Sequence, residues 1–595
     1  MEGVIQQVFC ERRQKQHPIP FPDRRKLERR QILQDVIFER HSQQPSIQKL
    51  KSISREISIP VQDIKLQTFT LLVNGEDIDT GKYEYFPYAN KIITDFRTTL
   101  HIIKQLKIGK IQEDYKEYIF AKYCIGENDT NQGAIRAAHE ASKEFRFFPL
   151  AKRVKIMTDI YDLLMANKEL LIDLMVIEGH PRRLAEWEFL GMEQAYRKQS
   201  LEFYKDNITR KVGTVGQEVL YWKRQPDGVV CVCPPRNAPC SSSLIAGFAL
   251  LGGNALIIKP PLRSPISTIF LWRNIVYEAL KINAAPPGTL GIILGNSEFI
   301  MNEWIISPHI DDILFIGESN TGLKLANRVF QYGKKPILEL SGNDIMFIWK
   351  DAALDEAVES LLDGFLGSMQ ICMVPKKAFI HEEIYEAFEQ AFLARVTKLK
   401  IGLPSDPEVT LTPVVRIAEF YEFLDDAIKK GGELLCGGEK VDHHMIADQY
   451  GCFITPAVIR ITDSIKAIEM RCIQEENFFP LMPLVKVSAR DVGNGKPTKD
   501  MSIFMEMVNI ANNNEYGLRA SAWVNSSYYI RKFMDNIHNS GLLRINSRHT
   551  GFSPYLATHG GRGKSGGPYG EMNYMWEKTT HLQGVSLTRM NKRDK

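Results

Sequence analysis

The sequence predicts an α/β protein with parallel sheets, organised in more than one domain. Strand-like and helix-like segments alternate regularly from Gly228 to Leu338, and a second alternation runs from Asp344 to about Asn546. Strands that alternate with helices of ten or more residues form βαβ units, which build parallel sheets. At 595 residues, the chain is long enough for several domains of ordinary size.

Composition and charge exclude several classes of protein. The 75 basic and 71 acidic residues nearly balance, which argues against nucleic acid as the main partner. The most apolar stretch, Leu244–Ile258, is interrupted by glycines and is too short to span a bilayer, so we expect no membrane span. Nine cysteines without CxxC or Cys/His ligand spacing predict a reducing, cytoplasmic location and no metal site.

Residues 1–69 form a basic N-terminal extension with few aromatic residues. A solvated extension and a docking or targeting segment both fit this composition. Within it, residues 46–65 are expected to contain one or two helices. From Thr70 the sequence becomes strand-like. The segment Leu71–Glu76 contains Asn74-Gly75, a strong hairpin signal.

Helical patterns dominate Gln132–Met175, and the chain becomes strand-like at Val212–Gln225, where Gly213 and Gly216 predict a hairpin. The first alternation then predicts strands at 228–233, 255–258, 289–294, 312–315 and 336–338, and helices at 241–251, 267–280, between the third and fourth strands, and at 321–330.

Three loops at the carboxyl ends of these strands can bind a ligand, namely 234–239, 259–260 and 317–322. The last of them opens a helix, where backbone N–H groups and the helix dipole favour phosphate. Together they predict a nucleotide site at this edge of the sheet.

Cys372 is the candidate nucleophile. It follows apolar residues spaced as on one face of a long helix from Leu354 to Phe365, for which Asp351 is the expected N-cap. A short apolar strand, Lys377–Ile380, comes next. Upstream, Glu339 ends another apolar run. A thiol and a carboxylate base suffice for acyl transfer through a thioester, although a lone cysteine is more often a small buried hydrophobe.

Nine blocks of residues stand in the order of one family, and the chain resembles the aldehyde dehydrogenase superfamily over roughly residues 70–588. The blocks are Pro235-x-Asn237-x-Pro239, Gly253-Asn254-Ala255-x-x-x-Lys259-Pro260, Pro287-Gly288, Phe315-x-Gly317-x-x-x-x-Gly322, Leu338-Glu339-Leu340-x-Gly342, Gln370-x-Cys372, Glu475-Glu476-x-Phe478-x-Pro480, Tyr516-Gly517-Leu518 and Gly560-Gly561-x-x-x-Ser565-Gly566.

The resemblance implies the chemistry of the site. Cys372 attacks an aldehyde carbon, the oxyanion is held by the Asn237 amide and the Cys372 backbone N–H, and Glu339 activates water to hydrolyse the thioester. The cofactor is NAD or NADP, with Lys259 and Glu476 at its ribose hydroxyls and Phe478 beside the nicotinamide ribose. The implied cofactor-binding residues are Pro235, Lys259, Leu262, Gly295, Gly317, Gly322, Leu340, Glu476 and Phe478.

The resemblance also implies the organisation of the chain. A Rossmann-type cofactor domain takes residues 70–205 and 228–338, and an α/β catalytic domain takes 339–546. A β-hairpin oligomerisation arm combines 206–227 with 547–588. An edge strand left unpaired in a monomer is a liability, so we expect a homodimer or homotetramer.

Four residues depart from the family pattern. Arg236 replaces an aromatic residue, Met369 a glycine, Glu318 a small hydroxyl residue and Leu262 a glutamate common in NAD-using members. Leu262 cannot repel a 2′-phosphate, and the neighbouring Arg263 either binds that phosphate or is a solvated surface residue, so we expect NADP to be used at least comparably to NAD. A carboxylate facing the cofactor would weaken both cofactors, so Glu318 is expected to point away.

Two alternatives to aldehyde oxidation stay open at this point. An acyl-thioester reductase, acting on acyl-CoA or carrier-bound acyl groups, would share Cys372 and the cofactor, but a hydrolytic Glu339 would defeat it. The other is a catalytically silent scaffold on the same fold, suggested by Arg236, Met369 and Glu318. The sequence does not name the aldehyde.

Overall fold

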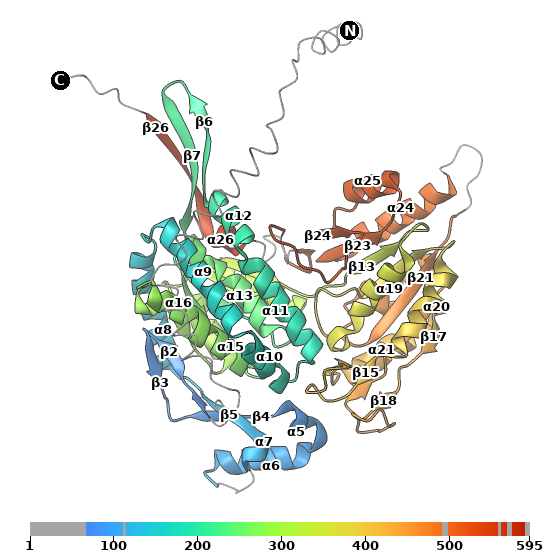
Figure 1. Ribbon diagram of the computed structural model, residues 1–595, viewed down its shortest axis with the longest axis horizontal. Helices are drawn as coiled ribbons and strands as arrows, with labels where there is room; N and C mark the ends of the chain where they lie inside the picture. Colours follow the sequence, from blue (N-terminus) through green and yellow to red (C-terminus); the bar gives the residue numbers. More distant parts are fainter. Residues whose placement is uncertain (1–66, 111–114, 491–497, 557–560, 568–573, 589–595) are drawn as a thin grey trace, which may run out of the picture. The chain divides into compact units, whose positions relative to one another are not determined.

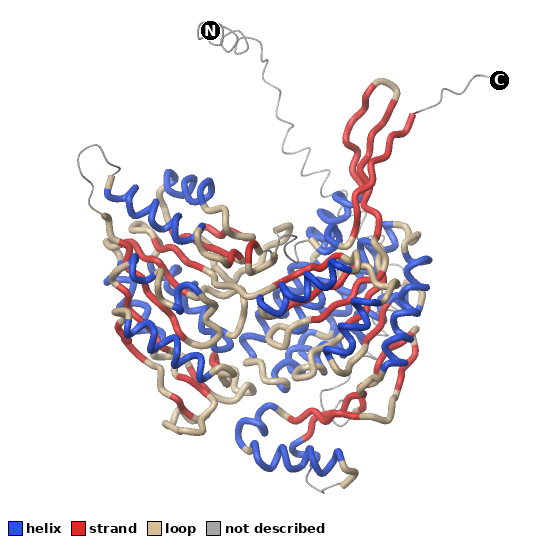
Figure 2. The backbone as a smooth tube through the Cα atoms, turned by 180° about the vertical axis from the view of Figure 1, so that it is seen from behind, coloured by secondary structure: helices blue, strands red, loops and turns tan. Residues whose placement is uncertain are grey.

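The computed structural model describes residues 67–110, 115–490, 498–556, 561–567 and 574–588. Two seven-stranded sheets form the framework, and helices lie along the faces of each sheet (Figures 1 and 2). The basic extension up to residue 66, with its expected helices, lies outside the described residues, as does Gly560 of the last family-like block. None of the described helices is long and apolar enough to cross a membrane.

The first sheet has the strand order β12-β11-β8-β9-β10-β2-β3, and its first five strands are parallel. They are β12 (Lys335–Glu339), β11 (Asp312–Ile316), β8 (Val229–Cys233), β9 (Ala255–Ile258) and β10 (Leu290–Ile292). The helices of this region are α8 (Asn128–Phe145), α9 (Leu150–Ala166), α10 (Lys168–Ile177), α11 (Arg182–Tyr196), α12 (Lys198–Ile208), α13 (Pro239–Ala246), α14 (Phe248–Gly252), α15 (Ile266–Phe270), α16 (Tyr277–Ile282), α17 (Ser297–Ile306) and α18 (Ser319–Gln331). The predicted alternation is therefore confirmed.

The predicted hairpin after Thr70 is also confirmed. Strands β2 (Leu71–Val73) and β3 (Glu76–Ile78) pair antiparallel, and β2 joins the sheet beside β10. Asn74 and Gly75 both have positive φ, 51° and 81°, as a tight primed turn requires. A smaller sheet precedes the helices; it consists of β1 (Thr68–Phe69), β5 (Ile119–Cys124) and β4 (Tyr83–Pro87), with α5 (Ala89–Thr94), α6 (Phe96–Lys107) and α7 (Tyr115–Tyr118).

The second sheet has the order β17-β20-β21-β14-β13-β23-β24 and is parallel except for β17. Neighbouring residues of β13 belong to different cores: Phe347 packs in one apolar cluster and Met346 in another. A strand buried on both faces needs a continuous apolar run, which is what the sequence supplies. The strands are β17 (Glu433–Cys436), β20 (Ala457–Ile461), β21 (Leu481–Val487), β14 (Lys377–His381), β13 (Ile345–Ile348), β23 (Arg519–Trp523) and β24 (Leu542–Ile545), and the longer helices are α19 (Leu354–Leu362), α20 (Tyr385–Val396), α21 (Ile417–Lys429), α24 (Lys499–Asn512) and α25 (Ser527–Asn536).

The segment before Cys372 differs from the prediction in two ways. Helix α19 ends at Leu362, and a tight 3-10 segment, Asp363–Met369, replaces the rest of the expected helix. The N-cap is Ala353 rather than Asp351, whose carboxylate instead accepts backbone N–H groups of Asn525 and Ser526. Asp351 therefore ties two loops together and caps no part of α19.

Three antiparallel strands form a ribbon in the order β26-β7-β6 (Figure 1). They are β6 (Thr209–Val215), β7 (Glu218–Pro226) and β26 (Thr580–Thr588), and the short helix α26 (Met575–Lys578) leads into the last. The predicted hairpin at 212–225 is confirmed, and β26 pairs with β7 along its full length.

Candidate active site

A cavity of about 230 Å³ lies where the carboxyl ends of β8, β11 and β12 face the loop that carries Cys372. Eight of the predicted site residues line it, namely Cys372, Glu339, Asn237, Pro235, Gly317, Leu340, Glu476 and Phe478. Residues from five separate stretches of the chain therefore meet around the candidate nucleophile.

Cys372 is half-buried and is a free thiol. Gly342 permits the packing around it, because a Cβ at Gly342 would lie 2.1 Å from the Cys372 carbonyl oxygen. Burial raises the pKa of the thiol, and the charges of Glu339, Glu476 and Asp344 raise it further, while Lys376 opposes them. The local field therefore keeps the resting thiol protonated.

Glu339 is the last residue of β12 and is only 1 % exposed, although a glutamate at a strand end is usually solvated. Glu339 lines the same cavity as Cys372, and after burial its charge has the largest effect on the pKa of the thiol. A buried carboxylate beside a thiol is suited to act as a general base.

Asn237 follows β8, and its side-chain amide donates to the Gln370 carbonyl at 2.9 Å. The amide therefore points at the nucleophile loop, two residues before Cys372. The backbone carbonyl of Asn237 lies 3.1 Å from Nε2 of His180, which helps to fix the loop. An amide donor held at this place can stabilise an oxyanion formed on Cys372.

Glu476 and Phe478 come from the segment between α23 (Arg471–Gln474) and β21. The Glu476 carboxylate accepts the Gly342 N–H at 3.0 Å, and burial raises its pKa. Two cations lie near the Phe478 ring, Lys376 at 5.4 Å and Arg416 at 5.5 Å from its centroid.

Four predicted residues lie outside the cavity lining. Lys259 is buried at the end of β9, and Leu262 is 37 % exposed, with its carbonyl accepting the Tyr123 hydroxyl at 3.0 Å. Gly295 packs against the Gly126 carbonyl, and Gly322 lets α18 approach Leu340, because a Cβ there would lie 2.3 Å from a Leu340 methyl. Close packing therefore requires a glycine at both positions.

The model of the aldehyde dehydrogenase family matches residues 107–585. This chain belongs to the aldehyde dehydrogenase family. The mitochondrial succinate-semialdehyde dehydrogenase of Arabidopsis thaliana is 28 % identical over 485 residues, which cover 79 % of this chain and 84 % of that protein. The NADP-dependent succinate-semialdehyde dehydrogenase of Escherichia coli is 26 % identical over 520 residues, covering 85 % and 95 %.

Solved structures agree with this aldehyde dehydrogenase fold. The NAD-dependent aldehyde dehydrogenase of Sinorhizobium meliloti matches with a TM-score of 0.73 at 22 % identity, over 90 % of this chain and 98 % of that one. The glyceraldehyde-3-phosphate dehydrogenase of Methanocaldococcus jannaschii, solved with NADP, gives 0.67 at 24 %, over 79 % and 97 %.

This aldehyde dehydrogenase departs from its family at Met369, which has a left-handed φ of 60°. The preceding Gly367 and Ser368 are left-handed as well, and such a conformation is costly for a residue with a branched or long side chain. Several hydrogen bonds hold the loop. Among them, Nζ of Lys376 donates to the Met369 carbonyl at 2.6 Å, and the Ser368 hydroxyl donates to the Thr412 carbonyl at 2.7 Å.

Glu318 does not point away from the site, so that expectation was wrong. The residue lines the cavity and is the N-cap of α18. Its carboxylate accepts the backbone N–H groups of Asn320 and Thr321, each at 2.8 Å. The N–H groups at a helix start need acceptors, and a neighbouring carboxylate satisfies them well.

Lys376 and Arg416 are site residues that sequence reasoning missed. Lys376 is fully buried, and burial lowers its pKa to about 8. The sequence did contain a signal for Lys376. The pair Lys376-Lys377 stands between two apolar segments, which predicts that these lysines are buried. Arg416 lies just before α21, and its local sequence gives no sign that it reaches the cavity.

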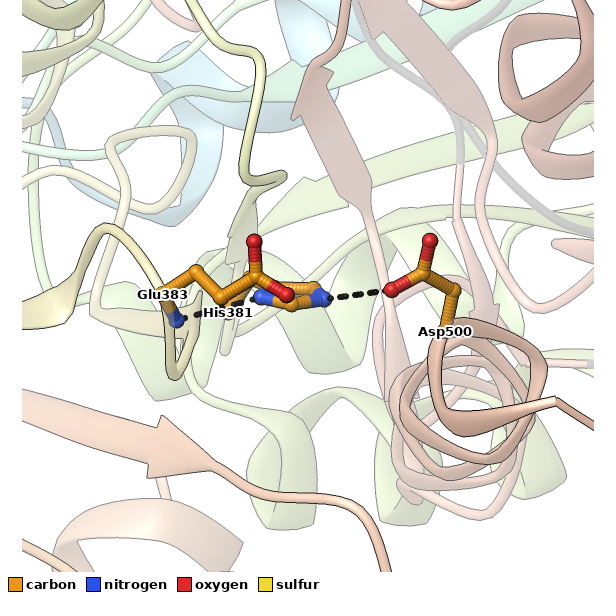
Figure 3. Close-up of side chains that lie close together, drawn as sticks. All are labelled: His381, Glu383 and Asp500. Carbon is orange, nitrogen blue, oxygen red and sulfur yellow. Dashed lines mark hydrogen bonds and ion pairs between the residues drawn. The ribbon is translucent and has the colours of Figure 1, made fainter.

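A separate cluster of possible metal ligands lies at the carboxyl end of β14 (Figure 3). Nδ1 of His381 accepts the Glu383 N–H at 3.2 Å, and its Nε2 lies 3.5 Å from Asp500. The ammonium of Lys350 is 2.8 Å from Asp500 and 3.6 Å from Glu383. Lysine therefore already supplies the positive charge between the two carboxylates.

Proposed function

We propose that this aldehyde dehydrogenase oxidises an aldehyde to a carboxylic acid with NAD or NADP, through a thioester on Cys372. The observation that carries the proposal is the single cavity lined by Cys372, Glu339 and Asn237. A nucleophile, a carboxylate base and an amide donor are the three groups that this chemistry requires.

In the first half-reaction, Sγ of Cys372 bonds to the aldehyde carbon, and the carbonyl oxygen becomes an oxyanion. The thiol proton passes to solvent water, so Glu339 stays available as the base of the second half-reaction. The Asn237 amide and the Cys372 backbone N–H then donate to the oxyanion. Donors fixed before the reaction are worth about 3–4 kcal/mol each to the transition state.

A bound NAD or NADP would supply the hydride acceptor that this oxidation needs. The residues present fit its ribose end: the half-buried Glu476 carboxylate is an acceptor for a hydroxyl, and the Phe478 ring belongs to the cavity lining. We expect Lys259, buried at the carboxyl end of β9, to donate to the ribose hydroxyls.

In the second half-reaction, Glu339 removes a proton from water, and the hydroxide attacks the thioester carbon. The carbon–sulfur bond breaks, Cys372 leaves as a thiolate, and the carboxylic acid is released. A buried Glu339 beside the thiol favours hydrolysis over transfer of the acyl group to or from a carrier.

The test is a panel of aliphatic, aromatic and amino aldehydes assayed with NAD and with NADP, following reduced cofactor and acid together. Equal amounts of acid and reduced cofactor support the proposal. Turnover that needs coenzyme A would identify an acyl-thioester reductase instead, and no turnover with any aldehyde or acyl-CoA would indicate a silent scaffold. The cytoplasmic location stays a prediction.

The cofactor preference can be tested at Leu262. Leu262 is exposed and carries no charge, so it neither holds the ribose hydroxyls nor repels a 2′-phosphate. We expect NADP to be used at least comparably to NAD, and Leu262→Glu to shift kcat/KM toward NAD by roughly ten- to a hundredfold, the worth of one like-charge contact.

Steady-state kinetics with both cofactors measure this shift. Leu262→Gln is the control, because it adds polarity without charge and should move the preference much less. If the wild type already prefers NAD by more than about a hundredfold, residues other than Leu262 determine the choice.

The β26-β7-β6 ribbon supports a homodimer or homotetramer. It exposes large apolar side chains, namely Val212, Val215, Trp222, Leu582, Val585 and Leu587. Within the described residues, β6 pairs only with β7, so its outer edge is open to another strand. A second copy of the chain would cover both the edge and the apolar side chains.

Light scattering at micromolar concentration should therefore give a mass of at least two chains. The double variant Val212→Lys and Val215→Lys should lower this mass, because charges on an edge strand oppose pairing. Phe147→Lys is the matched control, since Phe147 is 81 % exposed but lies outside the ribbon. A monomeric wild type would contradict the assembly.

A further inference from the structure

Glu318 occupies the start of α18 with a complete set of hydrogen bonds. One carboxylate oxygen accepts the Asn320 N–H, and the other accepts both the N–H and the hydroxyl of Thr321, all at 2.8 Å. Helix α18 is 13 residues long, so its N-terminus carries the full partial charge of a helix dipole. The negative side chain is therefore held where a phosphate would be attracted.

This position belongs to the proposed cofactor site. Glu318 follows Gly317 at the carboxyl end of β11, and both residues line the same cavity as Cys372. At this end of the cavity, the N–H groups of Asn320 and Thr321 already donate to Glu318. The negative carboxylate of Glu318 would also repel the diphosphate of a bound cofactor. Both effects act on the phosphates and neither acts on the nicotinamide end.

Two arginines, Arg236 and Arg416, supply positive charge in the cavity lining. Partial burial raises the pKa of Glu318, but the hydrogen bonds from Thr321 and Asn320 and, least of all, the charge of Arg416 lower it below its usual value. Arg416 also lines the cavity. Arg236 lines it as well, and its pKa is lowered by burial and by the nearby charges of Arg263 and Arg416. Crowded cations of this kind are stabilised by an anion.

We propose that Glu318 is an internal competitor of the cofactor diphosphate: it must leave the α18 N-terminus before the phosphates can bind there. The inference rests on the proposed NAD or NADP site. Release of Glu318 frees two N–H groups for the phosphates, and the charge of Arg416 in the same cavity lining favours a carboxylate or a phosphate there. The cap thus lowers affinity for any ligand with phosphates at this place, whichever base or nicotinamide it carries.

Three variants and three probes test this in the full chain. Glu318→Ser keeps a good helix cap but removes the charge and most of the side chain, and Glu318→Gln keeps the length and removes only the charge. Glu356→Ser makes the same change in the first turn of α19, where the glutamate is exposed. Calorimetry measures Kd for three kinds of probe: the reduced cofactors NADH and NADPH, then ADP, and finally adenosine, which lacks phosphate.

We expect Glu318→Ser and Glu318→Gln to bind NADH and ADP about tenfold more tightly than the wild type, the size of a favourable anion–helix contact. Adenosine affinity should not change, and Glu356→Ser should match the wild type with every probe. Unchanged or weaker ADP binding in both Glu318 variants would overturn the inference, while aldehyde oxidation by the wild type would leave the proposed function standing. Absence of NADH and NADPH binding in every variant would overturn both.

Discussion

Replacement of Cys372 by alanine is expected to abolish aldehyde oxidation while the protein still folds and binds its cofactor. Loss of a covalent nucleophile costs about 10⁴–10⁶ in kcat in enzymes that depend on one. The side chain removed is small and only half-buried, so the fold should survive. Steady-state assays measure the loss, and calorimetric titration with NADH shows that the site is intact.

The other thiols near Asn237 provide the control. Cys231 and Cys240 are completely buried, and Cys233 is half-buried on β8. Cys233→Ala should retain turnover. Substantial oxidation by Cys372→Ala, with loss in a variant of Cys231, Cys233 or Cys240, would assign the nucleophile to that residue instead.

Replacement of Glu339 by glutamine should separate the two half-reactions. The thioester should still form, giving a burst of one equivalent of reduced cofactor per active site, while steady-state turnover falls by about 10²–10⁴, the usual contribution of a general base. Stopped-flow absorbance resolves the burst from the slow phase that follows it.

A second measurement on Glu339→Gln uses the thiol itself. Because the Glu339 charge raises the pKa of Cys372, its removal should move alkylation of the thiol by iodoacetamide to lower pH. Glu188→Gln is the control for removing a buried carboxylate, since burial already raises the pKa of Glu188 and it lies outside the cavity lining. A normal steady state without a burst in Glu339→Gln would contradict the assigned role.

The sequence predicted the regular parts of the fold because their signals are local. Strand β9 was predicted with the bounds that the structure shows, and Asn74-Gly75 identified the hairpin. The helix expected over 241–251 is instead two helices that meet at Gly247. The missing Cβ of Gly247 leaves room for the Tyr196 hydroxyl, which donates to the Leu244 carbonyl at 2.8 Å. That contact joins residues 48 positions apart, which no local pattern reveals.

The sequence predicted the site residues that stand in recognisable motifs. It did not predict features that depend on contacts formed only in the folded structure. Cys372, Glu339 and Asn237 stand in recognisable motifs, and they line one cavity. The helix before Cys372 was predicted too long because residues in a 3-10 turn recur every three positions, a spacing that also fits an α-helical face. The orientation of Glu318 depends on backbone donors that exist only once α18 has formed.

The pairing of β7 with β26 determines when, during synthesis, the three-stranded ribbon can be completed. Asp227, just after β7, and His581, near the start of β26, are 354 residues apart and hydrogen-bonded. At roughly 5–20 residues per second, a ribosome takes tens of seconds to cover that interval. Until then β7 has only β6 as a partner, and Trp222 and the β7 edge stay accessible to other chains. Chaperone protection during synthesis should therefore matter most for this ribbon, and its last strand is the step that ends the period of risk.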